Sequence, residues 1–342
     1  MFGLPPLPRK LEACVRDLGS KKTDVRRSAI RDLAKIADGN EDTRKQAISL
    51  LSKSLTNDDE PSVRADAATA LADLRANECL PALLVAVEDA HPIVGQMALA
   101  ALGEINDCRA LPRIERAAKD DRPELRYQAA IARAQMLEGE ALLDALVAAI
   151  EDSDPNVRYI GLRLTEERIV KKDVRAAVVD ASSTIGKSIR KAAIAKEPAL
   201  SVASAILLGR LGDRSVIPEL LAAARKDRAI AKEDEEAVYE TLGALRVMEA
   251  KSLLETRAWG IRSMFEEGPA LAARVGLARL GDARAIKSIE EDVASPKLNK
   301  KTRGAVAAGR ARLKQLREKI ENAGLDPALV NDIFEEMNRE DG

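Results

Sequence analysis

Histidine and aromatic residues are scarce in this 342-residue chain, and their scarcity excludes several kinds of active site. His91 is the only histidine, so it excludes any metal site that needs two histidines and removes the usual general base of serine or cysteine catalysis. The three cysteines, Cys14, Cys79 and Cys108, lack the spacing of a structural zinc site and are too few for a disulfide framework. We therefore expect a non-enzymatic protein with no catalytic residue, no cofactor and no metal.

Long apolar runs and excess charge are also missing. No stretch approaches the roughly 18 uninterrupted apolar residues of a membrane span, and three prolines in the first nine residues interrupt any signal peptide. The 55 basic and 56 acidic residues give a net charge of −1, so no overall field attracts nucleic acid or an anionic membrane. With cysteines that read as reduced thiols, these features predict a cytoplasmic protein of unknown oligomeric state.

Four prolines stand 31 or 32 residues apart, and each opens the same phrase. The phrases begin at Pro61, Pro92, Pro123 and Pro155, and an aliphatic residue stands two positions after each proline. A repeat of this length indicates a solenoid, in which each unit buries its apolar face only against its neighbours.

Each repeat is predicted to be a pair of helices. Proline is tolerated at the first helical position, where its missing N–H has no partner, and Asp154 is a good N-cap before Pro155. Apolar residues recur at helical spacing on both sides of each proline, and no segment alternates with period 2. We expect an all-α fold, an α-solenoid of about nine helix pairs with a C-terminal capping helix at 326–337.

The spacing predicts three parts. Residues 1–170 hold regular repeats, with three pairs over 8–105 and two over 108–169. Residues 171–213 are expected to be irregular, with helical pieces at 171–182, 185–196 and 198–211. Residues 214–342 resume the pairs, roughly three of them up to 313, and end with the capping helix.

The phrases Leu211-Gly-Asp-Arg-Ser-Val-Ile-Pro-Glu-Leu-Leu221 and Glu151-Asp-Ser-Asp-Pro-Asn-Val-Arg158 resemble the short HEAT repeats named after phycobilin lyase subunits. The resemblance covers most of residues 8–313. It implies a row of Asp–Arg pairs that bridge adjacent repeats, with Asp58 and Arg64, Asp120 and Arg126, and Asp152 and Arg158 as the candidates. The row should lapse at Gly95 and at Thr184, which would leave Arg190 free.

Two tyrosines share one position of the repeat, four residues after the proline. Tyr127 and Tyr159 fall on successive second helices, which line the concave face in solenoids of this class. They are either a partner-binding hot spot or spacers between helices. Arg163 lies one helical turn beyond Tyr159, so we predict a partner-binding site at Tyr127, Tyr159 and Arg163, with Arg190 and its basic neighbours steering an acidic segment.

Two other patterns need comment. The segment 181–188 satisfies a loose phosphate-loop pattern that ends at Lys187, but no buried strand precedes it, and we interpret it as a coincidence. Residues 168–196 and 297–319 are rich in bases, which are either solvated or set the orientation of a partner.

Three functions compete. The first is a scaffold or adaptor that binds a protein partner along the concave face. The second is nucleic-acid binding, as in HEAT-like DNA glycosylases, although Trp259 lies outside the basic blocks and we do not expect nucleic acid. The third is attachment of a bilin chromophore, which only the repeats suggest. The sequence favours the scaffold and does not identify the partner.

Overall fold

The computed structural model describes residues 10–37, 40–75, 77–225, 230, 232–293, 304–311 and 314–315. Helices and turns account for these residues, and no strand occurs among them. The chain divides into two compact units, Met1–Arg175 (unit 1) and Ala176–Gly342 (unit 2). The predicted division into 1–170, 171–213 and 214–342 stays a prediction.

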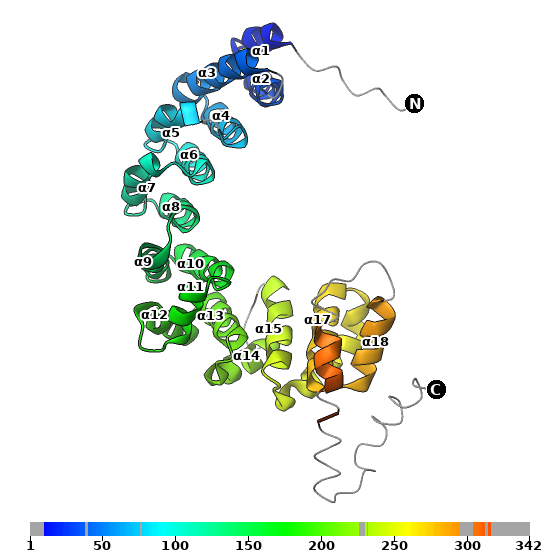
Figure 1. Ribbon diagram of the computed structural model, residues 1–342. Coiled ribbons are helices and arrows are strands. Elements are labelled where there is room, and N and C mark those ends of the chain that lie inside the picture. Colours follow the sequence, from blue (N-terminus) through cyan, green and yellow to red (C-terminus); the bar gives the residue numbers. More distant parts are fainter. Residues whose placement is uncertain are drawn as a thin grey trace, which may run out of the picture. The chain divides into compact units, whose positions relative to one another are not determined.

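Unit 1 is a double row of helices (Figure 1). The outer row consists of α1 (Leu11–Leu18), α3 (Glu41–Asn57), α5 (Leu80–Ala86), α7 (Leu111–Ala117) and α9 (Gly139–Ile150). The inner row consists of α2 (Thr23–Ile36), α4 (Pro61–Asp73), α6 (Pro92–Ile105), α8 (Pro123–Met136) and α10 (Pro155–Arg168). Short 3-10 turns, η1 (Asn77–Cys79) and η2 (Cys108–Ala110), lead into α5 and α7. The five predicted pairs over 8–169 are confirmed.

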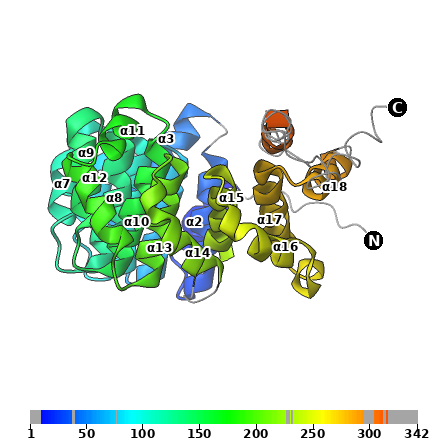
Figure 2. The ribbon, with the colours of Figure 1, turned by 90° about the horizontal axis from the view of Figure 1, so that it is seen from below.

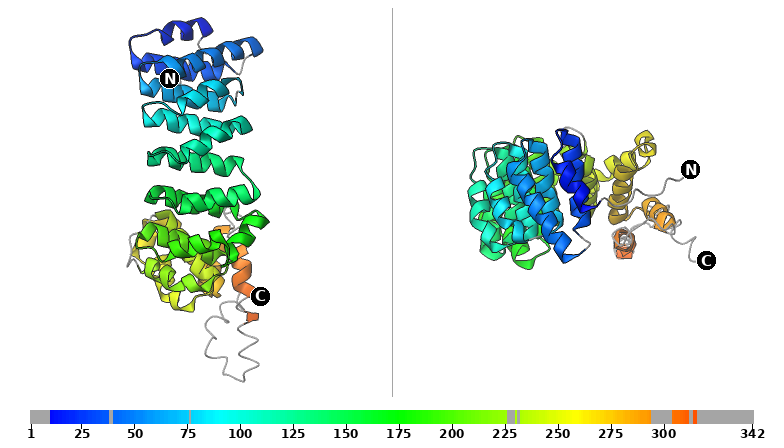
Figure 3. Two further views of the ribbon diagram at one scale, coloured as in Figure 1. Left: turned by 90° about the vertical axis from the view of Figure 1, so that its left-hand side faces the viewer. Right: turned by 90° about the horizontal axis from the view of Figure 1, so that it is seen from above.

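The two rows are stacked in layers. Within unit 1 the inner helices contact one another in sequence order, α2 with α4, α4 with α6, α6 with α8, and α8 with α10. The left view of Figure 3 shows these layers from the side, and Figure 2 shows α8 and α10 lying to one side of α7 and α9. The row curves so that the even-numbered helices lie on its inner side (Figure 1).

The repeated proline is the first residue of each of the last four inner helices, as its fixed φ and missing N–H predict. Asp154 caps α10, with its side chain accepting from the N–H groups of Asn156 and Val157. The aliphatic residue two positions after each proline is buried: Val63, Val94, Leu125 and Val157. The repeat phrase therefore supplies both the first residue of the helix, the proline, and a buried residue of the core.

A row of arginine–aspartate pairs joins successive inner helices, and we call it the Arg–Asp ladder. Arg26 binds Asp58, Arg64 binds Asp89 and Arg126 binds Asp152, each with Nε and Nη2 on the two carboxylate oxygens at 2.7–2.9 Å. Each aspartate lies in the turn before the inner helix of the next repeat. Such bidentate pairs are stronger than neutral hydrogen bonds, and these are only 10–14% exposed.

The predicted partners within the ladder were wrong by one repeat. Arg158 donates Nη1 to the backbone carbonyls of Asp152 and Ser153, whereas the Asp152 carboxylate accepts from Arg126 of the preceding repeat. Arg126 likewise donates Nη1 to the carbonyl of Asp120, six residues earlier. The six-residue offset in the sequence thus records a bond to the backbone, and the carboxylate bond spans 25 to 32 residues.

In the described part of unit 1 the ladder lacks one pair, the one that would join α6 to the turn before α8. Asp89 is paired with Arg64, contrary to the prediction of a lapse there. The aligned position on α6 is Gly95, so the next carboxylate, Asp120, binds Arg122 of its own turn at 2.8 Å. Arg122 also donates Nη1 to the Asp89 carbonyl and so keeps a bond between the two turns.

The irregular middle of the chain consists of three helices, as predicted. They are α11 (Lys172–Val179), α12 (Thr184–Ala193) and α13 (Pro198–Arg210). In unit 2, α12 packs on α13, so α11 is the additional helix. After it, the successive helices that contact one another in unit 2, α13, α15 and α17, carry odd labels.

Unit 2 continues the helix pairs. It contains α13, η3 (Arg214–Val216), α14 (Ile217–Ala224), α15 (Lys232–Ala244), η4 (Met248–Ala250), α16 (Lys251–Trp259), η5 (Ile261–Met264), α17 (Glu267–Leu280) and α18 (Ala283–Val293), followed by a helical segment at 304–311. The pairs α14 with α15, α16 with α17, and α18 with 304–311 confirm the three pairs expected before 313. The capping helix predicted at 326–337 lies outside the described residues.

Two glycines allow α15 and α17 to approach closely. A Cβ on Gly243 would stand 2.4 Å from Cα of Gly276, and a Cβ on Gly276 would stand 2.7 Å from the Tyr239 carbonyl oxygen. Real Cβ atoms do not approach backbone so closely, so neither position can carry a side chain without a shift of the helices. At this point α15 and α17 are therefore packed backbone against backbone.

Replacing Gly276 with alanine should force α15 and α17 apart. We expect the free energy of unfolding to fall by about 1–3 kcal/mol, the usual cost of overpacking, in urea denaturation of unit 2. Gly304→Ala is the matched control, because a Cβ there meets open space and alanine favours a helix. Equal stability of Gly276→Ala and the unmodified protein would contradict the close approach.

A double-mutant cycle tests the Arg–Asp ladder. Arg126→Ala and Asp152→Ala should each cost about 2 kcal/mol of unfolding free energy, between the values for exposed and buried pairs, and should be coupled. The cycle of Asp152 with Arg158 should show much weaker coupling, because those side chains meet only through backbone carbonyls. Strong coupling to Arg158 alone would disprove the assignment.

The same pair predicts a pH dependence. Burial raises the pKa of Asp152, but hydrogen bonds from Arg126 and the Asp154 amide outweigh it, so the pKa is below the ordinary range. The stability that this carboxylate contributes should be present above pH about 4 and lost as pH falls through the lowered pKa. Acid titration of unfolding should show a smaller loss in Asp152→Ala than in the unmodified protein.

Candidate functional site

The inner helices of unit 1 expose a regular grid of side chains. Counting the repeated proline as one, positions five, nine and thirteen lie one above the other on each helix. The side chains opposite the core occupy these positions, and on α4, α6, α8 and α10 all but Ala65 are at least partly exposed. Position five holds Ala65, Gln96, Tyr127 and Tyr159; position nine holds Thr69, Ala100, Ile131 and Arg163; position thirteen holds Asp73, Glu104, Gln135 and Glu167. We call these twelve residues the inner-face grid.

Tyr127 and Tyr159 lie in this grid on adjacent helices. α8 and α10 are in contact, and both rings are partly exposed rather than fully buried between helices. Tyrosine presents a rigid apolar ring with a polar tip, which suits a surface that binds another protein. The structure thus places the two predicted residues on the inner face of the row, and their role in binding stays a prediction.

Arg163 occupies position nine on α10, one turn beyond Tyr159. Its guanidinium pairs with Glu166 at 2.8 Å, with the arginine side chain 37% exposed. The pair is near the surface, so its contribution to stability is small and a partner's carboxylate could replace Glu166. The three predicted residues of unit 1 therefore belong to one surface.

Arg190 is not free, and the expectation that it lacks a carboxylate was wrong. It lies on α12 in unit 2 and pairs with Asp213 at 3.0 Å. It also donates to the carbonyls of Val178 and Gly186. The sequence register missed this contact because Asp213 stands before η3 rather than in a turn before an inner helix. Its part in partner binding stays a prediction.

Arg190 also borders a hollow of about 480 Å³ in unit 2. Ile194, Leu208 and Val216 contribute apolar walls, and Ile194 is 85% exposed. Glu219 lines the hollow and accepts from the Ser201 hydroxyl at 2.9 Å. The hollow has polar groups that are already paired, so its chemistry does not single out a ligand.

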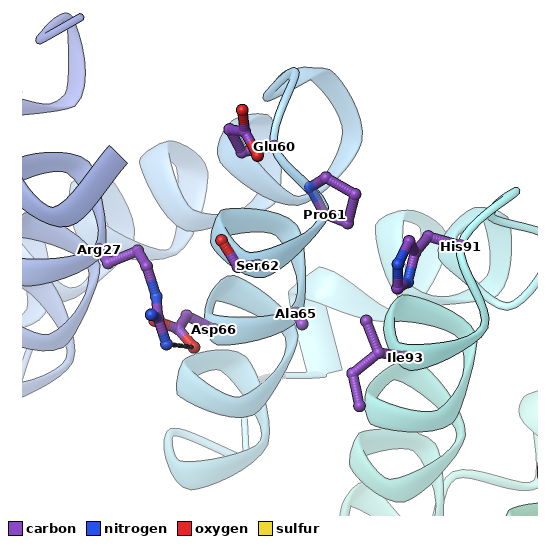
Figure 4. Close-up of a pocket in the computed structure, with 8 residues that line it drawn as sticks. All are labelled: Arg27, Glu60, Pro61, Ser62, Ala65, Asp66, His91 and Ile93. Carbon is purple, nitrogen blue, oxygen red and sulfur yellow. Dashed lines mark hydrogen bonds and ion pairs between the residues drawn. The ribbon is translucent and has the colours of Figure 1, made fainter. Parts of the chain in front are cut away.

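A second hollow, of about 370 Å³, opens on the inner helices of unit 1 (Figure 4). Arg27 of α2 reaches across to Asp66 of α4, with Nε 2.8 Å and Nη2 3.2 Å from the two carboxylate oxygens. Ala65 forms the floor, and Ile93 of α6 stands on the far side, 38% exposed. The small residues Ser62 and Ala65, at positions two and five of α4, leave space for this hollow. Sequence reasoning missed it, because a single alanine in an alanine-rich chain gives no signal.

The acidic row at position thirteen was also missed. Asp73, Glu104 and Glu167 are exposed, and within the described part of the chain their side chains form no ion pair or hydrogen bond. The signal was present in the sequence, because all three stand twelve residues after the repeated proline. The row ends at α2, where the three grid positions hold Arg27, Arg31 and Lys35.

The phosphate-loop pattern is a helix start. Ser183 is the N-cap of α12, and its Oγ accepts from the Gly186 N–H at 2.9 Å. Lys187 is exposed, and the preceding element is α11, not a strand. The arrangement is an ordinary helix cap with no cradle for phosphates.

His91 is the N-cap residue of α6, and its backbone N–H donates to Asp89 at 2.8 Å. Among the described residues, no group of three or more His, Cys, Asp or Glu side chains is placed to hold a metal ion. Within the described chain, no helix has the length and apolar character needed to cross a membrane.

Unit 2 contains a buried charged cluster that the sequence did not reveal. Arg257 is 6% exposed and binds Glu235 at 3.0 Å and Glu266, and the Tyr239 hydroxyl donates to Glu235 at 2.7 Å. Burial and the hydrogen bond to Glu235 raise the pKa of Tyr239. Arg257, between a largely buried acid and the more exposed Glu266, links α15, α16 and the turn before α17.

Trp259 is covered by cations. Arg284 lies 4.2 Å and Arg274 5.8 Å from the centre of its ring. Such stacking stabilises the contact between α16 and its neighbours α17 and α18. A ring occupied in this way does not offer an open platform for a nucleotide base.

Comparisons with known proteins agree with this fold. Residues 48–133 match the family model described as HEAT repeats. A comparison with curated protein sequences finds no significant match. The matched segment covers α4 to α7 and parts of α3 and α8, which supports HEAT repeats in this segment, whereas the phycobilin lyase subtype is not confirmed.

Two solved structures are similar over most of the chain. The X-ray structure of YibA from Escherichia coli has a TM-score of 0.54 at 15% identity and covers 80% of this chain and 92% of that one. A crystal structure of a Kap121p mutant has a TM-score of 0.55 at 13% identity and covers 89% of this chain but 37% of that one. At these identities the similarity shows the fold alone. The chain is an α-solenoid, and residues 48–133 of it match the model for HEAT repeats.

The capping assignment in α12 gives a simple test. Ser183→Ala should lower the free energy of unfolding by about 1 kcal/mol, because the Gly186 N–H loses its acceptor. Lys187→Ala should leave the melting temperature within about two degrees, since the side chain is exposed, and ATP should not stabilise either protein. Saturable ATP binding that is lost in Lys187→Ala would contradict the cap and support a phosphate site.

Proposed function

We propose that this chain is a non-enzymatic scaffold or adaptor that holds a protein partner against the inner face of unit 1. The observation that carries the proposal is the pair Tyr127 and Tyr159, at one repeat position on adjacent inner helices. Solenoids commonly use such extended faces for binding, and partly exposed aromatic rings are enriched among the residues that dominate binding energy. Arg163 extends the same surface by one helical turn.

Nucleic-acid binding and bilin attachment receive no comparable support. The tryptophan of unit 2 is stacked under two arginines, and the inner face of α4, α6 and α10 carries acids that repel phosphate. Nothing in the comparisons points to a tetrapyrrole. We further propose that the protein acts in the cytoplasm, where three cysteines that form no disulfide with one another would stay reduced.

Affinity capture followed by mass spectrometry would identify the partner, and two variants then test the site. Tyr127→Ala and Tyr159→Ala should each weaken binding at least tenfold, because each ring contributes of the order of 2 kcal/mol at a hot spot. Circular dichroism should show both variants folded. Phe265→Ala, which removes an 81% exposed ring in unit 2, is the control and should bind normally. Normal binding by both tyrosine variants would move the site elsewhere.

A further inference from the structure

The chemistry of the inner-face grid changes along the helices, from position five to position thirteen. Positions five and nine on α6, α8 and α10 are mostly uncharged, with Tyr127, Ile131 and Tyr159 exposing apolar surface. Position thirteen is acidic on α4, α6 and α10 and neutral at Gln135 on α8. The grid is therefore an apolar strip bordered by one negatively charged edge.

Helix polarity reinforces that edge. Position thirteen lies in the last turn of each inner helix, where the macrodipole places a partial negative charge. Asp73, Glu104 and Glu167 add full charges there, and their side chains have no cation bound to them within the described residues. The edge attracts cationic groups from outside the chain.

The spacing of the acids also defines what they can bind. Neighbouring inner helices lie about 9 Å apart, so the acids stand about 9 Å apart on α4 and α6, with a further two steps to α10. An extended polyproline-II segment rises about 3.1 Å per residue and repeats its direction every third residue, or about 9 Å. Every third side chain of such a segment can therefore face one inner helix.

We propose that the inner face of unit 1 binds an extended protein segment in which every third residue faces one inner helix, with lysine or arginine facing α4, α6 and α10 and apolar side chains between them. The cations face Asp73, Glu104 and Glu167, one per helix, with a neutral position opposite Gln135. The apolar side chains lie on Tyr127, Ile131 and Tyr159, as proline-rich and apolar segments do in aromatic-lined grooves. The inference rests on the proposed function and adds the chemistry of the partner.

The probe is a fluorescein-labelled peptide of fourteen residues on a proline-rich backbone. It carries lysine at its second, fifth and eleventh positions, to match α4, α6 and α10, and phenylalanine beside the eighth and eleventh, to match the tyrosines. Two companion peptides carry glutamate for lysine, or alanine for phenylalanine. Fluorescence anisotropy with the full chain measures each dissociation constant.

The lysine peptide should bind at least tenfold more tightly than the glutamate peptide, and high salt should weaken it. Asp73→Lys, Glu104→Lys and Glu167→Lys together should reverse this preference. The matched control reverses three exposed acids outside the inner helices, one in η1 and two on α9: Glu78→Lys, Glu140→Lys and Asp144→Lys. It should change binding less than twofold.

Three results would overturn the inference: no binding of the lysine peptide, tighter binding of the glutamate peptide, or unchanged binding by the triple variant of the acidic edge. The tyrosine variants separate this inference from the proposed function. If Tyr127→Ala and Tyr159→Ala weaken the captured partner while the lysine peptide fails, the site stands and the assigned partner chemistry falls.

Discussion

Each helix pair in this protein is too small to bury its own apolar face, and that constraint determines the whole architecture. A repeat of about 31 residues offers one stripe of aliphatic side chains, which becomes a core only when the next repeat covers it. The Arg–Asp ladder follows from the same need. The arginine of one repeat reaches the turn of the next, so it fixes how far apart two layers can lie while their apolar faces close.

The ladder also separates the two surfaces of the row. Its arginines and aspartates lie at the helix starts, where they satisfy carbonyls and amides of the turns. The inner-face grid, by contrast, lies along the helices, and all of its residues except Ala65 are at least partly exposed. Exposed side chains on a rigid support of packed helices are a usual setting for a binding surface.

Much of the fold could be predicted from the sequence, because its determinants are local. Proline at the first helical position, helical spacing of apolar residues and the three pieces at 171–211 need no knowledge of distant contacts. The ladder partners could not be assigned, since Arg126 lies 26 residues from the carboxylate that it binds and six residues from one that it does not. The carboxylate partner of Arg190 was missed for a similar reason, because Asp213 lies 23 residues further along the chain. The two tyrosines could be found because they share one repeat position, and the hollow at Ala65 could not, because it arises from what small residues leave unfilled.

Gly95 makes one repeat of unit 1 fit only certain neighbours. A Cβ at this position would stand 2.9 Å from both Leu125 Cδ2 and the Val87 carbonyl oxygen, so the arginine found in other repeats has no room there. In the turn that follows, Arg122 takes the place of that arginine, since it binds the Asp120 carboxylate and donates to the Asp89 carbonyl. Duplication or exchange of this module would bring a steric clash or an unmatched carboxylate to its new neighbours.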